Sequence, residues 1–297
     1  MYLNEKGYLE LLKNVLKNGE NIENRNGNTL STFGNMIKFD NINNNFPLLT
    51  TKKIYFKGVL EELLWFLKGS TNAKELQDKK VHIWDGNSTR EYLDANGFKN
   101  YEVNELGPIY GWQWRTFGKK YNKNGDENGV DQIRYIIEEL LKPKNSRRAI
   151  LTGWNPLQLS EMALPPCHMI YNFYKSSEGL SCLMTMRSSD LFLGLPFNIA
   201  STAILTKIIA TVLHMDIKSI AISITDAHIY EEHKSAVEEQ LNRNIILNSE
   251  IKLKITSKPP LMKSTIDEKI NWINNLKYSD FVLEDYNAQP AIKAIMK

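Results

Sequence analysis

Apolar residues recur at helical spacing in five segments of the chain, the pattern of helices with one buried face. These segments are 7–17, 58–67, 132–141, 199–213 and the more polar 230–243. Strands are predicted where β-branched and aromatic residues alternate or cluster. They are 29–39, 150–154, 169–174 and 180–186, and the polar turn 175–179 joins the last two. Helices and strands mix without a repeat, which predicts a single α+β domain over residues 1–297 with apolar helices covering a sheet.

Two stretches of the chain lack an apolar face. Residues 119–129 read as a polar loop, and residues 257–278 read as an irregular region with a short helix near 266–276. Neither stretch separates halves of different composition, so neither is predicted to be a boundary between domains.

Composition narrows the class of protein. Apolar residues make up 42% of the 297 residues and charged residues 24%, as in an average soluble globular protein. A net charge of +3 is too small to indicate a nucleic-acid partner. The longest apolar stretch, 199–215, is interrupted by Ser, Thr and Lys, so no membrane span is predicted. Two cysteines suggest a reducing compartment, and we expect a cytoplasmic protein.

Cys167 is the first candidate for chemistry, because it follows two prolines and precedes the titratable ring of His168. It is either a small buried apolar residue or a nucleophile. Cys182 lies in an alternating strand and is predicted to be a core residue.

Arginine is scarce in this chain, which has 29 lysines and 8 arginines. Half of the arginines fall in three short segments, at Arg25, at Arg147 with Arg148, and at Arg187 next to Ser188 and Ser189. Guanidinium groups beside a hydroxyl suit a phosphate dianion, whereas the alternative is a set of surface ion pairs. An arginine near Cys167 would also favour its thiolate form.

Two neighbouring glutamates differ in their helical phase. Glu61 shares a face with lysines and is predicted to be solvated, whereas Glu62 shares a face with Val59, Trp65 and Phe66. A carboxylate in apolar surroundings has a raised pKa and can shuttle protons, unless it curls out to water.

Further polar candidates surround the apolar segment 199–213. Asn198 is either the N-cap of that helix or a reader of a ligand's amide edge. His228 and Tyr230, two apart on an extended segment, are predicted to share a face. Neither a metal-ligand spacing nor a glycine-rich phosphate loop is found in the sequence, so no metal is expected.

Taken in order, these segments resemble the thymidylate synthases along nearly the whole chain. The matching motifs are Arg25 with Gly27, FPLLTTK at 46–52, ELLWF at 62–66, IWD at 83–85, GPIYG at 107–111, QWR at 113–115, SRR at 146–148, LPPCH at 164–168, RSSD at 187–190, GLPFN at 194–198 and DAHIY at 226–230. The segment 84–93 is similar to the eukaryotic form of the family.

The resemblance implies a fold and a reaction. The fold is a twisted mixed six-stranded sheet covered by helices, with two sheets back to back in a homodimer. The reaction is the reductive methylation of dUMP by 5,10-methylenetetrahydrofolate, which gives dTMP and dihydrofolate without a metal.

The resemblance also implies roles for single residues. Cys167 adds to C6 of uracil, and proton transfer and ordering of the reactants fall to Glu62, His168, Tyr110 and Asp190. The dUMP-binding residues are Arg25, Arg187, Ser188, Ser189, Asp190, Asn198, His228 and Tyr230, with Arg147 and Arg148 donated from the partner subunit. The folate pocket is formed by Ile83, Trp84, Asn87, Asp190, Leu193, Gly194, Phe197 and Met296.

The sequence departs from the family pattern at four places. Met186 replaces a common glutamine and Thr225 a glycine, the tail 291–297 is short and ends in lysine, and the region 257–278 is long. Met186 favours a rival, a pyrimidine deoxynucleotide hydroxymethylase, but Asn198 favours uracil, because its amide complements the O4 and N3–H edge. A non-catalytic RNA-binding relative is the third alternative, and the intact Cys167 argues against it.

Overall fold

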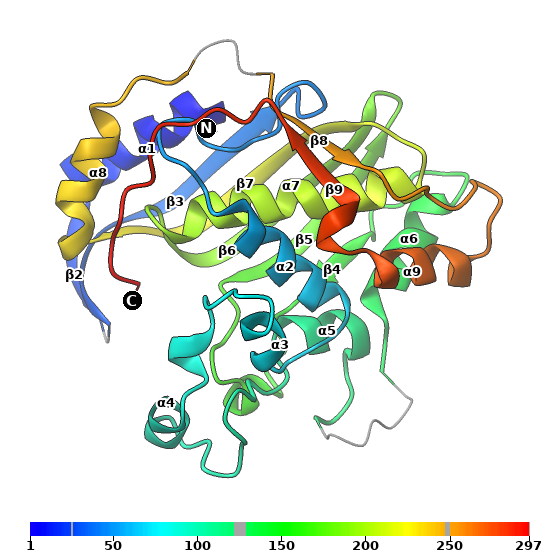
Figure 1. Ribbon diagram of the computed structural model, residues 1–297, viewed down its shortest axis with the longest axis horizontal. Coiled ribbons are helices and arrows are strands. Elements are labelled where there is room, and N and C mark those ends of the chain that lie inside the picture. Colours follow the sequence, from blue (N-terminus) through cyan, green and yellow to red (C-terminus); the bar gives the residue numbers. More distant parts are fainter. Residues whose placement is uncertain (25, 122–128, 247–249, 297) are drawn as a thin grey trace.

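A seven-stranded mixed sheet organises the chain in the computed structural model, which describes residues 1–24, 26–121, 129–246 and 250–296 (Figure 1). Six strands follow one another in the order β1-β3-β7-β6-β5-β4, and β2 pairs with β3 as a seventh, one more than expected. Their bounds are β1 Tyr2–Leu3, β2 Glu20–Asn24, β3 Gly27–Asp40, β4 Ile150–Thr152, β5 His168–Ser176, β6 Gly179–Asp190 and β7 Ile217–Tyr230. The pairs β1·β3 and β6·β7 are parallel, and the other pairs are antiparallel.

The predicted helices are confirmed, several with shifted ends. They are α1 Asn4–Asn18, α2 Phe56–Leu67, α6 Gln132–Leu141, α7 Gly194–Val212, η3 Glu231–His233 with α8 Lys234–Leu241, and α9 Ile266–Asn275. The hydrophobic pattern did not predict α3 Lys74–Gln77, α4 Arg90–Ala95, α5 Tyr110–Thr116 and the small sheet of β8 Lys252–Ile255 with β9 Phe281–Glu284. Three further short helical turns are η1 Asp85–Asn87, η2 Leu159–Glu161 and η4 Tyr278–Asp280.

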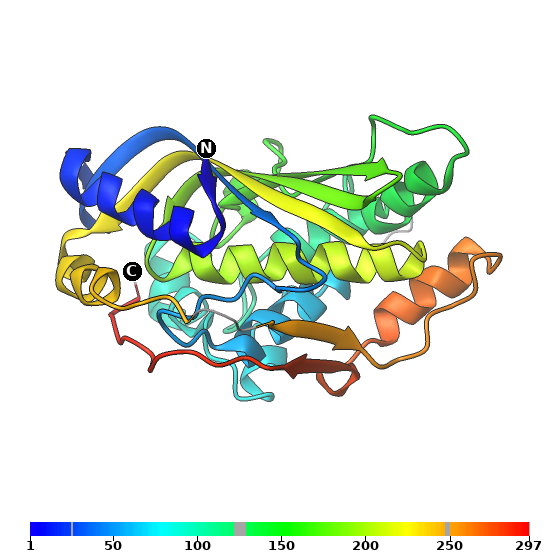
Figure 2. The same ribbon diagram turned by 90° about the horizontal axis from the view of Figure 1, so that it is seen from above.

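Helix α7 packs on one face of the sheet (Figure 2). The side chains of Cys182, Met184 and Met186 on β6 are buried. By length and hydropathy α7 could cross a membrane, but 78% of its apolar window is buried inside the protein. Helix α7 is therefore the core helix of the fold. Its length and hydropathy alone are weak evidence for a membrane span.

The other face of the sheet has no helix over its central strands (Figure 2). Large apolar side chains on several strands are exposed in this chain: Phe33, Met36, Ile150, Ile170, Tyr174 and Leu183. Phe33 is 86% exposed, which is an unusual state for a phenylalanine in a strand. Apolar exposure spread over several strands of one sheet is typical of an interaction surface.

The region 257–278 is ordered by its own polar contacts. Thr265 and Glu268 form a capping box at the start of α9. The buried Lys269 ammonium donates to the carbonyls of Leu261, Met262 and Ser264 at 2.6–3.0 Å. These contacts account for the local structure of this region.

Candidate active site

Cys167 faces a guanidinium group at the start of β5. Arg187 Nη2 lies 3.6 Å from Cys167 Sγ. The same side chain donates to the carbonyls of Pro165 at 3.1 Å and Pro166 at 2.8 Å. The two prolines and the arginine therefore fix the thiol, and Cys167 is not merely a core residue.

Burial and charge act in opposite directions on this thiol. Burial raises the pKa of Cys167, and the Arg187 charge opposes that rise without cancelling it. The expected effect of arginine is thus confirmed in direction, but the thiol form prevails in the free protein. Cys182 is buried, and its burial raises the thiol pKa to about 12, as expected of a core cysteine.

Tyr110 and His168 form a stacked pair beside the thiol. The Tyr110 hydroxyl accepts the Cys167 backbone N–H at 2.7 Å, and its ring lies 4.1 Å from the His168 ring with 15° between their planes. The Tyr171 hydroxyl lies 2.8 Å from His168 Nδ1. Burial lowers the pKa of His168 to about 3, so this imidazole is neutral at physiological pH.

Glu62 has the environment that its helical phase predicts. Trp84 Nε1 donates to Glu62 Oε1 at 2.8 Å. Burial raises the pKa of Glu62 to about 7, and the Trp84 hydrogen bond only partly offsets that rise. Glu62 can therefore hold or release a proton near neutral pH, the property that a general acid–base group needs.

The prediction for Glu61 is wrong. Its side chain is only 8% exposed and forms an ion pair with Lys79 at 2.6 Å. Lys79 follows α3, which the sequence analysis did not predict, and that segment covers this face of α2.

A polar cluster occupies the ends of β6 and β7. Ser188 Oγ donates to Asp226 Oδ2 at 3.1 Å, and His228 Nδ1 lies 3.4 Å from the same oxygen. Ser31 donates to the other Asp226 oxygen. The rings of His228 and Tyr230 are in contact at 5.2 Å, which confirms that they share a face. Hydroxyl and imidazole groups on adjacent strands thus form a ready hydrogen-bonding surface.

Thr225 leaves this cluster in place. The pairing of β7 with β3 and with β6 keeps one register on both sides of Thr225, from Ile224 to Asp226. Gly34 lies opposite Thr225 on β3 and adopts a φ of 76°, which glycine tolerates without strain. His228 is therefore paired with Ser31 on β3 and with Asp190 on β6 in the same register as its neighbours.

Asp190 and Asn198 flank the first turn of α7. Asp190 Oδ1 accepts the N–H groups of Phe192 at 2.9 Å and Leu193 at 3.3 Å. A Cβ on Gly194 would lie 3.7 Å from Asp190 Cβ and 3.9 Å from Asn198 Oδ1, so glycine leaves open space beside both. Helix α7 begins at Gly194, so Asn198 lies inside the helix and is not its N-cap. Within the described ranges its side-chain amide has no hydrogen-bond partner, which leaves it available to a ligand.

The remaining predicted residues are spread more widely. Trp84 is buried, whereas Ile83, Asn87, Leu193 and Phe197 are partly exposed. Ser189 is buried, and its Oγ lacks a hydrogen-bond partner in the described part of the chain. Met296 is 62% exposed. Arg147 and Arg148 are exposed on the loop between α6 and β4, away from Cys167, and Arg25 lies outside the described residues.

Three residues near the site were missed by the sequence analysis. Tyr171 contacts His168, and His233 lies between Asp190 and the end of the chain. Lys52 is buried with its ammonium 3.4 Å from the centre of the Phe192 ring, and burial lowers its pKa to about 7. Lys52 ends the motif FPLLTTK and is followed directly by the exposed Lys53, so the sequence carries no local signal that sets the buried lysine apart.

No group of three or more metal-ligating side chains occurs in the parts of the chain that the structure describes. The site instead combines a thiol beside a guanidinium, a carboxyl that titrates near neutrality, and hydroxyl and imidazole donors. Such a set is suited to an enzyme that forms a covalent adduct with a small anionic substrate through a cysteine.

The comparisons with known proteins give the family. Residues 6–297 match the family model described as thymidylate synthase. The chain is 42% identical to the thymidylate synthase of Saccharomyces cerevisiae over 98% of this chain and 96% of the yeast protein. It is also 42% identical to the thymidylate synthase of Homo sapiens, over 98% of this chain and 90% of the human protein. The chain belongs to the thymidylate synthase family.

Some relatives are longer proteins. The bifunctional dihydrofolate reductase-thymidylate synthase of Paramecium tetraurelia is 42% identical over 98% of this chain but only 61% of its own length. The chain spans about half to three fifths of the bifunctional relatives that it matches.

Proposed function

We propose that the protein methylates dUMP to dTMP with 5,10-methylenetetrahydrofolate and releases dihydrofolate. The observation that carries the proposal is the Cys167 thiol, fixed 3.6 Å from the Arg187 guanidinium in a chain of this family. Membership of the family supports the reaction, and the geometry supports the residues assigned to each step.

Cys167 begins the reaction by covalent addition. Its thiol loses a proton, the sulfur forms a bond to C6 of uracil, and the electron pair of the ring double bond moves to C5 and O4. C5 then forms a bond to the one-carbon unit and loses its proton, and the bond between that carbon and the folate nitrogen breaks. The exocyclic methylene that results takes a hydride from the folate, and the sulfur–C6 bond breaks as the ring double bond re-forms. The folate supplies both the carbon and the hydride. Because burial keeps the free thiol protonated, the adduct requires substrate and Arg187 together.

Glu62 is the proton-transfer residue in this proposal. Its pKa of about 7 lets it give a proton to the uracil O4 region and take it back at neutral pH. Tyr110 holds the Cys167 backbone and His168 holds Tyr110 by stacking. A neutral His168 donates or accepts a hydrogen bond without carrying charge, which suits an orienting role.

The binding residues divide by the part of dUMP that each contacts. Arg187 and Ser188 bind the phosphate, together with Arg25 and with Arg147 and Arg148 of the partner subunit. His228 and Tyr230 bind the deoxyribose hydroxyl, and their shared face supports this. Asn198 reads the uracil edge, which its unpartnered amide supports.

The folate site is proposed at the start of α7 and the turn before η1. Its residues are Ile83, Trp84, Asn87, Asp190, Leu193, Gly194, Phe197 and Met296. The partial exposure of Ile83, Leu193 and Phe197 supports contact with a flat ring, because apolar surface is already open there.

A homodimer is part of the proposal. The exposed apolar side chains on the open face of the sheet support pairing of two sheets back to back. Arg147 and Arg148, exposed beside the edge strand β4, are free to enter a partner's site. We also propose a cytoplasmic location, which the two free thiols suit.

The rival function is a hydroxymethylase on the same fold, in which water rather than hydride is added. Met186 favours it, because this residue stands where a glutamine is common in thymidylate synthases. Asn198 weighs against the cytosine-specific form, because a mismatched buried polar pair costs about 1–3 kcal/mol.

One assay separates these functions. Pure protein is incubated with dUMP and methylenetetrahydrofolate, dihydrofolate is followed by absorbance, and the nucleotide is identified by mass. Dihydrofolate formed together with dTMP is the expected result. A hydroxymethyl nucleotide without dihydrofolate would move the protein to the rival function.

A further inference from the structure

His233 lies between a carboxylate of the site and the C-terminal tail. Its ring is buried, with Nε2 2.8 Å from the Ile295 carbonyl oxygen and Nδ1 3.8 Å from Asp190 Oδ1. The rings of Phe192 and Tyr230 pack against it at 5.7 and 5.4 Å. A carbonyl only accepts hydrogen bonds, so Nε2 is the donor to Ile295.

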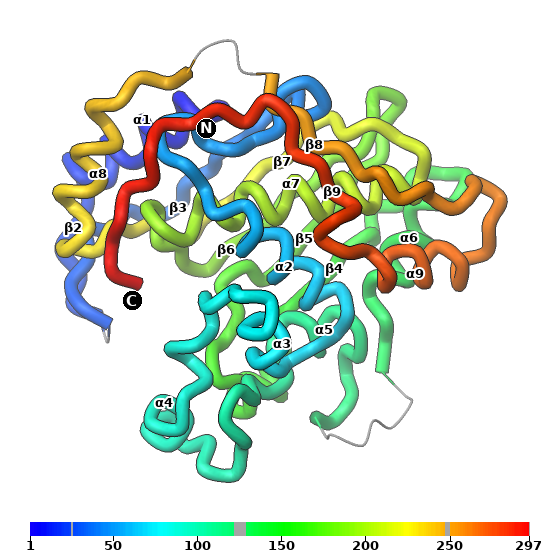
Figure 3. The backbone as a smooth tube through the Cα atoms, in the orientation of Figure 1, coloured from blue at the N-terminus to red at the C-terminus, as the bar shows by residue number. Residues whose placement is uncertain are grey.

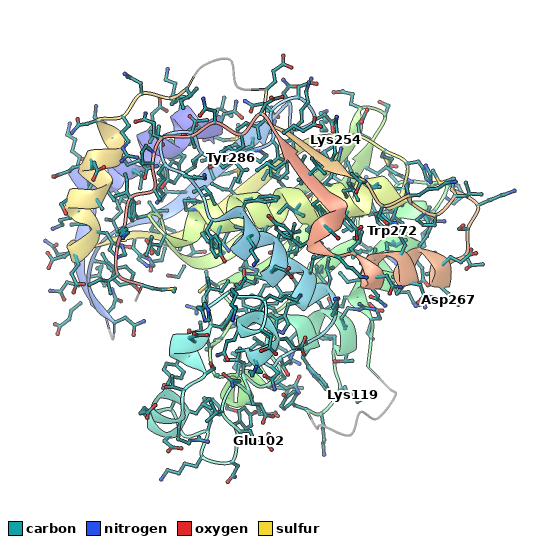
Figure 4. All side chains as sticks on the ribbon, viewed as in Figure 1. Glu102, Lys119, Lys254, Asp267, Trp272 and Tyr286 are labelled. Carbon is teal, nitrogen blue, oxygen red and sulfur yellow. The ribbon has the colours of Figure 1, made fainter. Side chains whose placement is uncertain are left out.

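The other polar anchors of the tail that the structure describes lie in its first half. Figure 3 shows the path of the tail. Tyr286, which is labelled in Figure 4, donates its hydroxyl hydrogen to the Leu49 carbonyl at 2.9 Å. The Gln289 backbone N–H donates to the Thr50 carbonyl at 2.8 Å. Arg243 donates to the Pro290 carbonyl at 2.5 Å. These bonds hold the tail beside the segment that leads into α2.

Beyond Pro290, the bond from His233 is the one hydrogen bond found within the described residues. Ile292 and Ala294 pack partly against the core, but the side chains of the last two described residues add little, because Ile295 is 70% exposed and Met296 is 62% exposed. The position of the last residues therefore depends on His233 more than on any other polar contact.

The protonation of His233 links the tail to Asp190. With a proton on Nε2 alone, Nδ1 presents a lone pair to the Asp190 carboxylate, and Nδ1 has no hydrogen-bond partner in the described chain. With both nitrogens protonated, the ring bonds the tail carbonyl on one side and faces a carboxylate with an N–H on the other. The second state removes the repulsion between the Nδ1 lone pair and the carboxylate and places opposite charges 3.8 Å apart.

We propose that His233 is a positioning residue that holds the last residues of the tail against the Asp190 end of the site, so that tail closure and the Asp190 carboxylate are coupled. The identity of the ligand beneath the tail as a folate rests on the proposed function. The contact between His233 and the tail is independent of that function.

Charges around the ring favour the imidazolium. Burial lowers the pKa of His233. This effect is outweighed by Asp190, the Ile295 carbonyl and Glu232, so the pKa is raised overall. The tail is therefore held most firmly below the raised pKa, and the bond weakens as pH rises through it. The other titratable groups near this position are Tyr230 on β7, Lys52 over the Phe192 ring, and Tyr8 on α1, which interacts with Asp190.

The first test follows the tail itself. Carboxypeptidase Y is added to the full-length protein, and release of Met296 and Ile295 is timed by mass spectrometry against a free peptide of residues 286–297. His233→Phe fills the same space without the donor and is expected to speed release about tenfold. His233→Gln keeps an N–H donor and is expected to restore slow release while removing its dependence on pH.

A matched control tests whether any histidine bond gives this effect. His214 Nε2 lies 2.8 Å from the Pro260 carbonyl, but this histidine is exposed and follows the other end of α7. His214→Gln is expected to leave tail release and its pH dependence as in the wild type. Equal release in wild type and His233→Phe would overturn the proposal, as would a pH dependence that persists in His233→Gln.

The second test measures the consequence for the site. In both His233 variants the Kd for dUMP alone is expected to stay unchanged, whereas His233→Phe raises the KM for methylenetetrahydrofolate about tenfold. Faster tail release with an unchanged KM would overturn the coupling to the site. If the wild type makes no dTMP, the proposed function fails, but the release experiment still decides whether His233 holds the tail.

Discussion

The indole N–H of Trp84 donates to the Glu62 carboxylate at 2.8 Å, from a segment 22 residues further along the chain. This contact gives a buried carboxyl group one fixed partner and leaves the rest of its charge poorly solvated. Burial raises the Glu62 pKa to about 7, and the Trp84 hydrogen bond offsets only part of that rise. The residue is thus prepared for proton transfer at a cost in stability that depends on pH.

We expect Glu62→Gln to stabilise the protein at pH 8 and to leave stability unchanged at pH 4. A carboxyl whose pKa rises from 4.5 to about 7 on folding binds more protons in the native state, so stability falls as pH rises through that interval. The loss is at most about 1.4 kcal/mol per pH unit, because the two states differ by at most one bound proton at Glu62. Thermal unfolding of the wild type and of Glu62→Gln at pH 4 and pH 8 measures this difference in stability.

Glu61→Gln is the matched control, because it makes the same change one residue earlier. It breaks the ion pair with Lys79, whose side chain is 38% exposed. We expect a loss of about 1 kcal/mol or less at pH 8, opposite in sign to the effect of Glu62→Gln. Equal shifts from both variants would rule out the assigned environment of Glu62.

The same Glu62→Gln variant is expected to lose turnover by about a hundredfold or more, because general acid–base groups contribute at that scale. The limb of the wild-type pH–rate profile near pH 7 should disappear from the residual activity. A limb that remains in Glu62→Gln would assign the titration to another group.

Local patterns predicted the parts of the fold that depend on nearby residues. Helix α6 matches its prediction at both ends, because Asp131 caps its start and Pro143 follows its end. The environment of Glu62 follows from helical phase alone. The long strand β7 was missed in its first half, where serine and lysine alternate with isoleucine in a segment that joins two predicted helices.

The remaining features could not be predicted from the sequence pattern, because they depend on contacts between segments far apart in the chain. Glu61 is buried because Lys79 arrives from a helix that the sequence pattern does not reveal. Asn198 lies inside α7 because the helix begins four residues earlier, with Pro196 tolerated in its first turn. The role of His233 depends on a tail more than 50 residues away, and no local pattern encodes such a contact.

Arg187→Gln is expected to slow alkylation of Cys167 by iodoacetamide at pH 7 at least about threefold. The guanidinium lowers the thiol pKa, so its removal leaves only the effect of burial and reduces the thiolate fraction. Labelling is measured by peptide mass spectrometry. Cys182, whose pKa is about 12, serves as the internal unreactive reference. Unchanged labelling in Arg187→Gln would mean that the guanidinium does not act on the sulfur.

Asn198→Asp is expected to shift preference from dUMP towards dCMP. The amide of Asn198 complements the O4 and N3–H of uracil, whereas a protonated carboxyl complements the amino edge of cytosine. Mismatch of a buried polar pair corresponds to about a tenfold to hundredfold change in the ratio of kcat/KM values. Competition assays with both nucleotides give this ratio. A ratio equal to that of the wild type would show that Asn198 does not read the base.

Leu183→Glu is expected to convert a dimer into monomers. Leu183 alternates on β6 with the buried Cys182 and Met184, so its exposed side chain lies on the open face of the sheet, where a charge buried in a sheet-to-sheet interface would remain unpaired. Light scattering after gel filtration measures the mass, and Val130→Glu, at an exposed position outside the main sheet, is the control. A wild-type protein that is already monomeric would remove the homodimer from the proposed function.

Mixing two inactive variants tests whether the sites are shared between subunits. Cys167→Ser lacks the nucleophile, and Arg147→Ala lacks the arginine that the proposal places in the partner's site. In a mixed dimer, the intact Cys167 belongs to the Arg147→Ala subunit and receives Arg147 from the Cys167→Ser subunit, so one of the two sites is complete. Random exchange makes half of the dimers mixed, and we expect about a quarter of wild-type activity to return. If Arg147 instead serves its own subunit, no mixed site is complete and the mixture stays as inactive as its components.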